Sequence, residues 1–127
     1  MMMLPRSVRI FIAREPTDMR KGHDGLAALV QNTMKADLFS GHLFVFLSKQ
    51  RNRVKILTWD RGGLVMWYKR LEKGRLKMPK INADAASLEL DSGELSMLLE
   101  GLDLSKVRRP KRWEPPKIAA CVSSMTL

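Results

Sequence analysis

The sequence is poor in cysteine and aromatic residues, and it has no long hydrophobic run. Its single cysteine, Cys121, cannot form a disulfide within the chain, which excludes a disulfide-stapled scaffold and is typical of the reducing cytoplasm. The longest apolar runs, such as residues 43–47 and 64–68, are only five residues long, so we expect neither a secretory signal nor a membrane-spanning helix. These absences predict a cytoplasmic protein with no membrane partner.

Acidic residues are also scarce. The chain has 13 Asp and Glu against 23 Lys and Arg, a net charge of +10 over 127 residues. Residues 49–80 alone carry 11 basic and 2 acidic side chains, residues 82–105 carry six acidic and no basic ones, and residues 106–117 are basic again. This excess positive charge predicts a polyanion or an acidic protein as a partner.

The length and an apolar content of 45% predict one stable domain. We expect a single α+β domain over residues 1–105, followed by a basic, flexible C-terminal arm and tail over residues 106–127. Strand-like apolar runs lie at residues 8–12, 43–47, 54–59, 64–71 and 76–78.

Two segments have the apolar spacing of a helix. The first covers residues 19–34, and its regular part is expected to begin near Asp24, a candidate cap. The second covers residues 95–102, behind a capping-box pair of Asp91 and Glu94. The expected fold is therefore an antiparallel β-meander packed with two amphipathic helices on one face, so that a basic surface stays exposed on the other face or at an edge.

No spacing of catalytic residues supports an enzyme. Neither histidine has a metal-ligand pattern around it, and His23 is expected to pack on the apolar face of its helix. The glycines match no phosphate-binding loop. The carboxylates that a metal-dependent nuclease would use show no shared site: Asp18, Asp24, Asp37 and Asp60. We therefore predict a protein without catalytic activity, metal or cofactor.

The basic strands favour nucleic-acid binding, because cations contact phosphates and aromatic rings stack on bases. The aromatic candidates are Trp59, Trp67 and Tyr68, although at least one tryptophan is expected in the core. The predicted backbone-binding residues are Arg51, Arg53, Lys55, Lys69, Arg70, Lys73, Arg75, Arg108, Arg109, Lys111 and Arg112.

Four stretches in order carry a resemblance to a known family: TDMRKGHDGLA at residues 17–27, SGHLFVF at 40–46, KRLEKGR at 69–75 and LLEGLD at 98–103. They resemble the TnpB (Orf2-like) accessory protein of the sixty-sixth family of bacterial insertion sequences. The resemblance implies a role in DNA transposition beside a separate transposase, and it carries over no active site. The family motif comprises Thr17, Asp18, Met19, Arg20, Lys21, Gly22, Asp24 and Gly25.

The motif has two physical interpretations. In the first, Arg20, Lys21 and the backbone amides at the helix start hold a phosphate or an acidic side chain. In the second, Gly22 and Gly25 allow close packing of helix on sheet while Arg20 pairs with a neighbouring aspartate.

Two functions follow for the whole chain. The first is a non-catalytic transposition factor that binds the DNA backbone through the basic sheet surface and the arm. The alternative is an adaptor that recruits or regulates the transposase, or binds another accessory protein of the same element. The oligomeric state and any preference for DNA sequence are not predicted.

Overall fold

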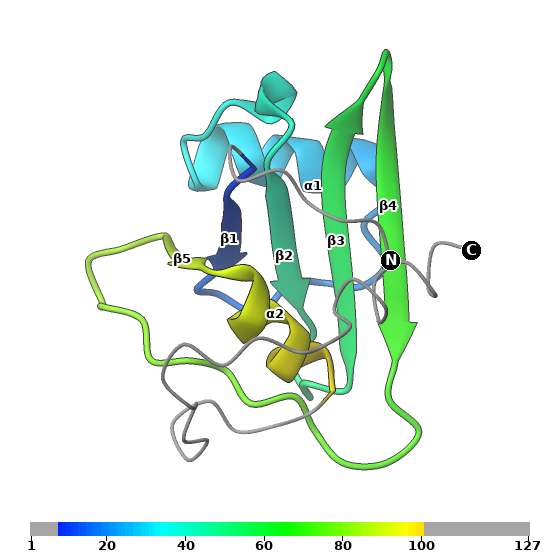
Figure 1. Ribbon diagram of the computed structural model, residues 1–127, viewed down its shortest axis with the longest axis vertical. Coiled ribbons are helices and arrows are strands. Elements are labelled where there is room, and N and C mark those ends of the chain that lie inside the picture. Colours follow the sequence, from blue (N-terminus) through cyan, green and yellow to red (C-terminus); the bar gives the residue numbers. More distant parts are fainter. Residues whose placement is uncertain (1–7, 101–127) are drawn as a thin grey trace, which may run out of the picture.

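The computed structural model describes residues 8–100, which form one five-stranded mixed sheet with helices on both faces (Figure 1). The strands are β1 (Ile10–Ala13), β2 (Leu43–Leu47), β3 (Arg53–Asp60), β4 (Gly63–Arg70) and β5 (Ser87–Leu90). Their spatial order is β4-β3-β2-β1-β5. The sheet is open, so β4 and β5 are its two edges. The predicted α+β class is confirmed.

The meander β2-β3-β4 is antiparallel as predicted, because short local turns join its strands. The turn between β3 and β4 has Arg61 and Gly62 at positive φ, 45° and 88°, which matches the twist of the two strands. By contrast, β1 pairs with β2 in parallel, with Ile10 opposite Leu43. The purely antiparallel prediction was wrong here, since the connection over residues 14–42 carries a helix and crosses over one face of the sheet.

The helical segments fall on the two opposite faces. On one face lie α1 (His23–Ala28), the π-helical turn η1 (Leu29–Thr33) and the 3₁₀ turn η2 (Leu38–Ser40). On the other face lies α2 (Ser92–Leu99) (Figure 1). Its predicted capping box is present, with the Asp91 carboxylate accepting the Glu94 N–H at 2.7 Å. Of the two expected alternatives, the open face was wrong, because both faces have cores of their own, whereas β4 and β5 are edges with no further strand among residues 8–100.

Each core uses alternate residues of the central strands. On the α1 face Leu26 and Val30 pack against Phe44 and Phe46 of β2. On the α2 face Leu95 and the other helix leucines pack against the opposite side of the same strands. The second core includes Ile12, Val45, Val54, Ile56, Leu76, Leu90, Leu98 and Leu99.

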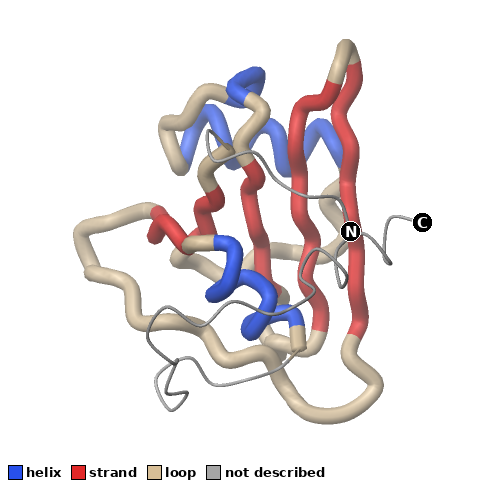
Figure 2. The backbone as a smooth tube through the Cα atoms, viewed as in Figure 1, coloured by secondary structure: helices blue, strands red, loops and turns tan. Residues whose placement is uncertain are grey.

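Two local expectations differ from the structure. Residues 76–78 form no strand but belong to an irregular segment that connects β4 to β5 across the α2 face (Figure 2). The edge strand β5 was missed, since it is only four residues long and offers two apolar side chains to a sequence pattern. Helix α1 begins at His23 after Gly22 as the N-cap, so Asp24 lies in the first turn and does not cap it. His23 itself is exposed.

Candidate nucleic-acid interface

The family motif forms a loop that is tied to the sheet before α1 begins; we call residues 17–22 the motif loop. The Thr17 N–H donates to the carbonyl of Leu47 at the end of β2, at 2.8 Å. The ammonium of Lys55, on β3, donates to the carbonyls of Met19 and Lys21 at 2.7 and 2.8 Å. Lys55 is buried, and it therefore acts as a clamp beneath the motif loop.

Asp18 and Arg20 close the motif loop on itself. The Arg20 backbone N–H donates to Asp18 Oδ1 at 2.9 Å, and the Arg20 guanidinium donates to both carboxylate oxygens, the shortest of its bonds being 2.8 Å. The guanidinium and then this N–H lower the pKa of Asp18 to about 2. The motif's carboxylate is thus paired within the loop.

The glycines of the motif do not explain the close packing of helix on sheet. A Cβ at Gly22 would meet nothing within 4 Å, and a Cβ at Gly25 would meet the Lys21 side chain at 3.0 Å. The pairing of Arg20 with Asp18 is confirmed, while the glycine part of that interpretation is wrong.

The connection between β2 and β3, which we call the 48–53 loop, is built around one hydroxyl. Ser48 Oγ accepts the backbone N–H groups of Asn52 and Arg53 at 3.2 and 3.1 Å. The Ser48 N–H donates to the Arg53 carbonyl at 3.0 Å, and Arg51 adopts a left-handed φ of 61° at the tip. These bonds hold Lys49 and Gln50 outward beside the motif loop.

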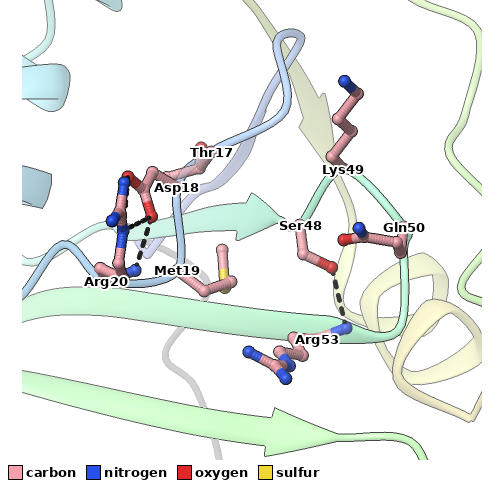
Figure 3. A pocket seen from close by; sticks show the side chains of 8 residues that line it. All are labelled: Thr17, Asp18, Met19, Arg20, Ser48, Lys49, Gln50 and Arg53. Carbon is pink, nitrogen blue, oxygen red and sulfur yellow. Dashed lines mark hydrogen bonds and ion pairs between the residues drawn. The ribbon is translucent and has the colours of Figure 1, made fainter.

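The motif loop and the 48–53 loop face each other across a pocket of about 280 Å³ (Figure 3). Figure 3 shows the motif side chains on one side and those of the 48–53 loop on the other. We call it the motif pocket, and its lining residues are Thr17, Asp18, Met19, Arg20, Ser48, Lys49, Gln50 and Arg53. Its lining therefore holds three cations and one carboxylate, and that carboxylate is already paired with Arg20.

Arg53 contributes a buried, unsatisfied donor to this lining. Its Nε is buried and, in the part of the chain that the structure describes, has no hydrogen-bond partner. Arg53 also lies directly opposite Arg70 of β4, so two like charges are neighbours on the α1 face of the sheet. Arg70 contacts Glu72 at 3.3 Å in an exposed pair, which screens it only weakly.

The family is shown by comparison with known proteins. A family model described as "IS66 Orf2 like protein" matches residues 8–109. The chain belongs to this family. Two uncharacterised proteins of Sinorhizobium fredii are similar to this chain over almost their whole length: y4jC is 37% identical over 90% of this chain and 96% of its own, and y4hO is 36% identical over 91% and 99%. No solved structure matches the chain.

Membership of the IS66 Orf2-like family indicates an accessory role in transposition. The match covers the motif loop, the 48–53 loop and β4, so the motif pocket lies wholly within the family region. No helix among residues 8–100 is long and apolar enough to cross a membrane. Over the same residues no three His, Cys, Asp or Glu side chains gather as a metal site.

The predicted backbone-binding residues do not form one surface. Arg53 and Arg70 lie together beside the motif pocket, and Arg51 lies at the tip of the 48–53 loop. Lys55 and Lys69 hold backbone carbonyls instead, Lys69 donating to the carbonyl of Leu99 at 2.8 Å. Lys73 and Arg75 are exposed in the segment after β4. The predicted residues Arg108, Arg109, Lys111 and Arg112 lie outside the described residues.

Lys49 was not predicted from the sequence to belong to the site, and its position across the motif pocket from Arg20 was not predicted either. The signal was available, because a short polar break between two buried strands must form a turn at one end of the sheet. The position of the motif loop at that same end was not predictable, since it depends on the crossover from β1.

The aromatic residues also divide between surfaces. Trp59 is partly buried and packs edge-on against Phe39 at 4.8 Å between ring centroids, while Trp67 is exposed. Neither reaches the core, so the expected buried tryptophan is absent from the described residues. Tyr68 is exposed on the α1 face, near Arg53 and Arg70, with the Lys55 ammonium 5.1 Å from its ring centroid.

The Asp18–Arg20 pair gives a pH prediction. Because the pKa of Asp18 is lowered to about 2 in the folded chain, its contribution to stability is complete above the ordinary value of 3.8 and is lost as the pH falls through 2. We expect the Asp18 carboxyl carbon to titrate near pH 2 by NMR. In Arg20→Gln the midpoint rises towards 3.8, whereas Arg9→Gln, which breaks the separate Arg9–Glu89 pair, leaves it unchanged. An Asp18 midpoint near 3.8 in the wild type would contradict the pairing.

Proposed function

We propose that this chain is a DNA-backbone-binding accessory factor in transposition and that the motif pocket holds a backbone phosphate. The observation that carries the proposal is that Arg20, Lys49 and Arg53 converge on one pocket, where the buried Nε–H of Arg53 has no hydrogen-bond partner among residues 8–100. A buried donor without an acceptor costs about 1–3 kcal/mol, and charge-assisted bonds from the rest of the same guanidinium to a phosphate would offset that cost.

The charge balance supports an anion at this site. Asp18 is neutralised by Arg20, so Lys49 and Arg53 face the pocket without a carboxylate partner in the described chain. Arg70 adds a third positive charge directly across from Arg53. Like charges at opposite positions of neighbouring strands repel each other, and a bound phosphate would convert this repulsion into attraction.

The residues around the motif pocket favour contact with the DNA backbone and not recognition of the base sequence. Tyr68 exposes a ring on the same face as Arg53 and Arg70, where it can stack on a base or a sugar. Phosphate contacts set position and affinity but carry no sequence information. We therefore expect similar affinity for duplexes of different sequence.

The adaptor alternative is less well supported. The apolar side of α2 is buried where the structure describes it, since Leu95, Leu98 and Leu99 pack in the core of the α2 face. Glu94 is engaged in the capping box and accepts the Asp91 N–H at 2.9 Å. Family membership suggests association with the transposase, but the leucines of α2 that the structure describes are buried in the core and are not exposed for docking.

Titration of a fluorescent 30-base-pair duplex by anisotropy tests the proposal. For the wild type the affinity should fall about a hundredfold or more between 50 and 200 mM salt, because several phosphate contacts release counterions. Arg53→Gln should weaken binding about five- to tenfold at low salt and reduce the salt slope by about one. Lys35→Gln removes the same charge from an exposed site between η1 and η2, in the connection that precedes β2, and it should change affinity less than twofold.

Two results would contradict this function. Affinity that does not depend on salt would exclude backbone binding. Equal losses in Arg53→Gln and Lys35→Gln would show that net charge alone attracts DNA, and that the motif pocket holds no phosphate.

A further inference from the structure

The outer edge of β4 is the largest unpaired feature of the sheet. β4 has eight residues and stands last in the strand order, and no strand of residues 8–100 pairs with its outer side. The opposite edge, β5, has only four residues. A long edge strand presents a row of N–H and C=O groups that can pair with another chain.

The hairpin register identifies those groups. Asp60 pairs with Gly63 across a two-residue turn, so this pair and every second pair after it bond to β3. The bond from the Leu71 N–H to the Asn52 carbonyl, 2.7 Å long, continues the same alternation. The residues whose backbone groups point outward are therefore Leu64, Met66, Tyr68 and Arg70.

Over residues 63–68 the edge lacks the features that usually prevent association. Its register runs through eight consecutive pairs with no bulge, and residues 63–68 contain no proline and no charge. Three large side chains of this run are exposed: Val65 at 47%, Trp67 at 43% and Tyr68 at 48%. Val65 and Trp67 lie on the α2 face and Tyr68 on the α1 face, so both sides of the edge are apolar.

We propose that β4 pairs antiparallel with β4 of a second copy of this chain, about a two-fold axis at Trp67, and joins the two five-stranded sheets into one. The charge distribution selects this arrangement. The only charges of β4 are Lys69 and Arg70 at its C-terminal end. Antiparallel pairing places them against the apolar start of the other strand, whereas parallel pairing would set like charges side by side.

The register about Trp67 satisfies both backbone and side chains. The outward-facing residues of one copy meet those of the other, Met66 opposite Tyr68 and Leu64 opposite Arg70, which gives about eight hydrogen bonds. On the α2 face, Trp67 meets its own symmetry mate and Val65 meets Lys69 of the second copy. The axis is perpendicular to the sheet, so both motif pockets would open on the same face of the assembly.

Sedimentation equilibrium of nuclease-treated protein in 0.5 M salt tests the pairing separately from DNA binding, which high salt suppresses. The wild type should form a dimer that dissociates on dilution. Val65→Lys places a cation opposite Lys69 of the second copy, twice per dimer, and should raise the dissociation constant about tenfold or more. Val65→Glu places an anion there and should leave the dimer as tight as the wild type or tighter.

Three results would overturn the proposal. They are a monomer at every concentration, equal weakening in Val65→Lys and Val65→Glu, and equal weakening in the control Phe39→Lys, which alters an exposed apolar residue away from the edge. Circular dichroism of each variant confirms that the fold is kept, since both sites are exposed.

Amide exchange gives a second, independent measurement. In the dimer the N–H groups of Leu64, Met66, Tyr68 and Arg70 should become protected as concentration rises. Protection that does not change with concentration would mean that another part of the same chain covers this edge, and fast exchange at all four positions would mean that nothing does; either result overturns the proposal.

Discussion

Replacing Lys55 by methionine should lower the free energy of unfolding by about 2–3 kcal/mol. Methionine keeps the apolar stem that is buried beneath the motif loop but removes the ammonium. The carbonyls of Met19 and Lys21 then lose a charged donor at 2.7 and 2.8 Å, and bonds to charged groups contribute about 1.5–3 kcal/mol each. The relief of a buried positive charge offsets part of this loss.

Urea denaturation followed by circular dichroism measures the change. Lys21→Met is the matched control, because Lys21 is exposed and its substitution should cost less than about 0.5 kcal/mol. Lys55→Met should also speed amide exchange in residues 19–22, whereas Lys21→Met should not. Equal stability of the two variants would show that the Lys55 ammonium does not hold the loop.

Lys55 shows which features of the structure could be predicted from the sequence and which could not. Lys55 lies between Val54 and Ile56, and the period of two places it on the other face, beside Leu57. From the sequence, Lys55 was predicted to be one of many exposed cations that bind a nucleic-acid backbone. That prediction would be correct only if this face of the sheet were open. Since α1 and the motif loop cover the face, the same charge became an internal donor.

Features set by neighbouring residues were predictable. The β3–β4 turn, the capping box of α2 and the run of β2 each depend on a few adjacent side chains, and each is present. Pairing across long sequence separations was not predictable. The parallel β1–β2 pair and the antiparallel β1–β5 pair join segments that are about 30 and 80 residues apart, and no local pattern in a four-residue strand encodes its partner.

The candidate site follows the same division. The sequence pattern identified the motif and the basic strands as separate features, and it predicted a broad basic surface on the sheet. The structure brings the motif loop to the 48–53 loop through the β1–α1–β2 crossover, which concentrates Arg20, Lys49 and Arg53 around one pocket. A basic surface spread over three strands would not require the two loops to lie side by side. The pocket therefore depends on the tertiary fold.

The segment after β4 provides the second large effect. Leu76→Ala should lower the free energy of unfolding by about 2–5 kcal/mol, although residue 76 belongs to no helix or strand. Leu76 is completely buried in the core of the α2 face, and its N–H donates to the carbonyl of Arg51 at 2.5 Å. Alanine would leave a cavity beneath α2 and loosen the 48–53 loop from the same side.

The neighbouring position supplies the control. Lys77 is exposed, so Lys77→Ala should change stability by less than about 0.5 kcal/mol. Buried and exposed side chains alternate at residues 76 and 77, and this alternation is why the sequence pattern predicted a strand. Leu76 is nevertheless buried because the segment lies across the face of the sheet, and not because it pairs with the sheet edge. If Leu76→Ala costs no more than Lys77→Ala in urea denaturation, the Leu76 side chain does not stabilise the core of the α2 face.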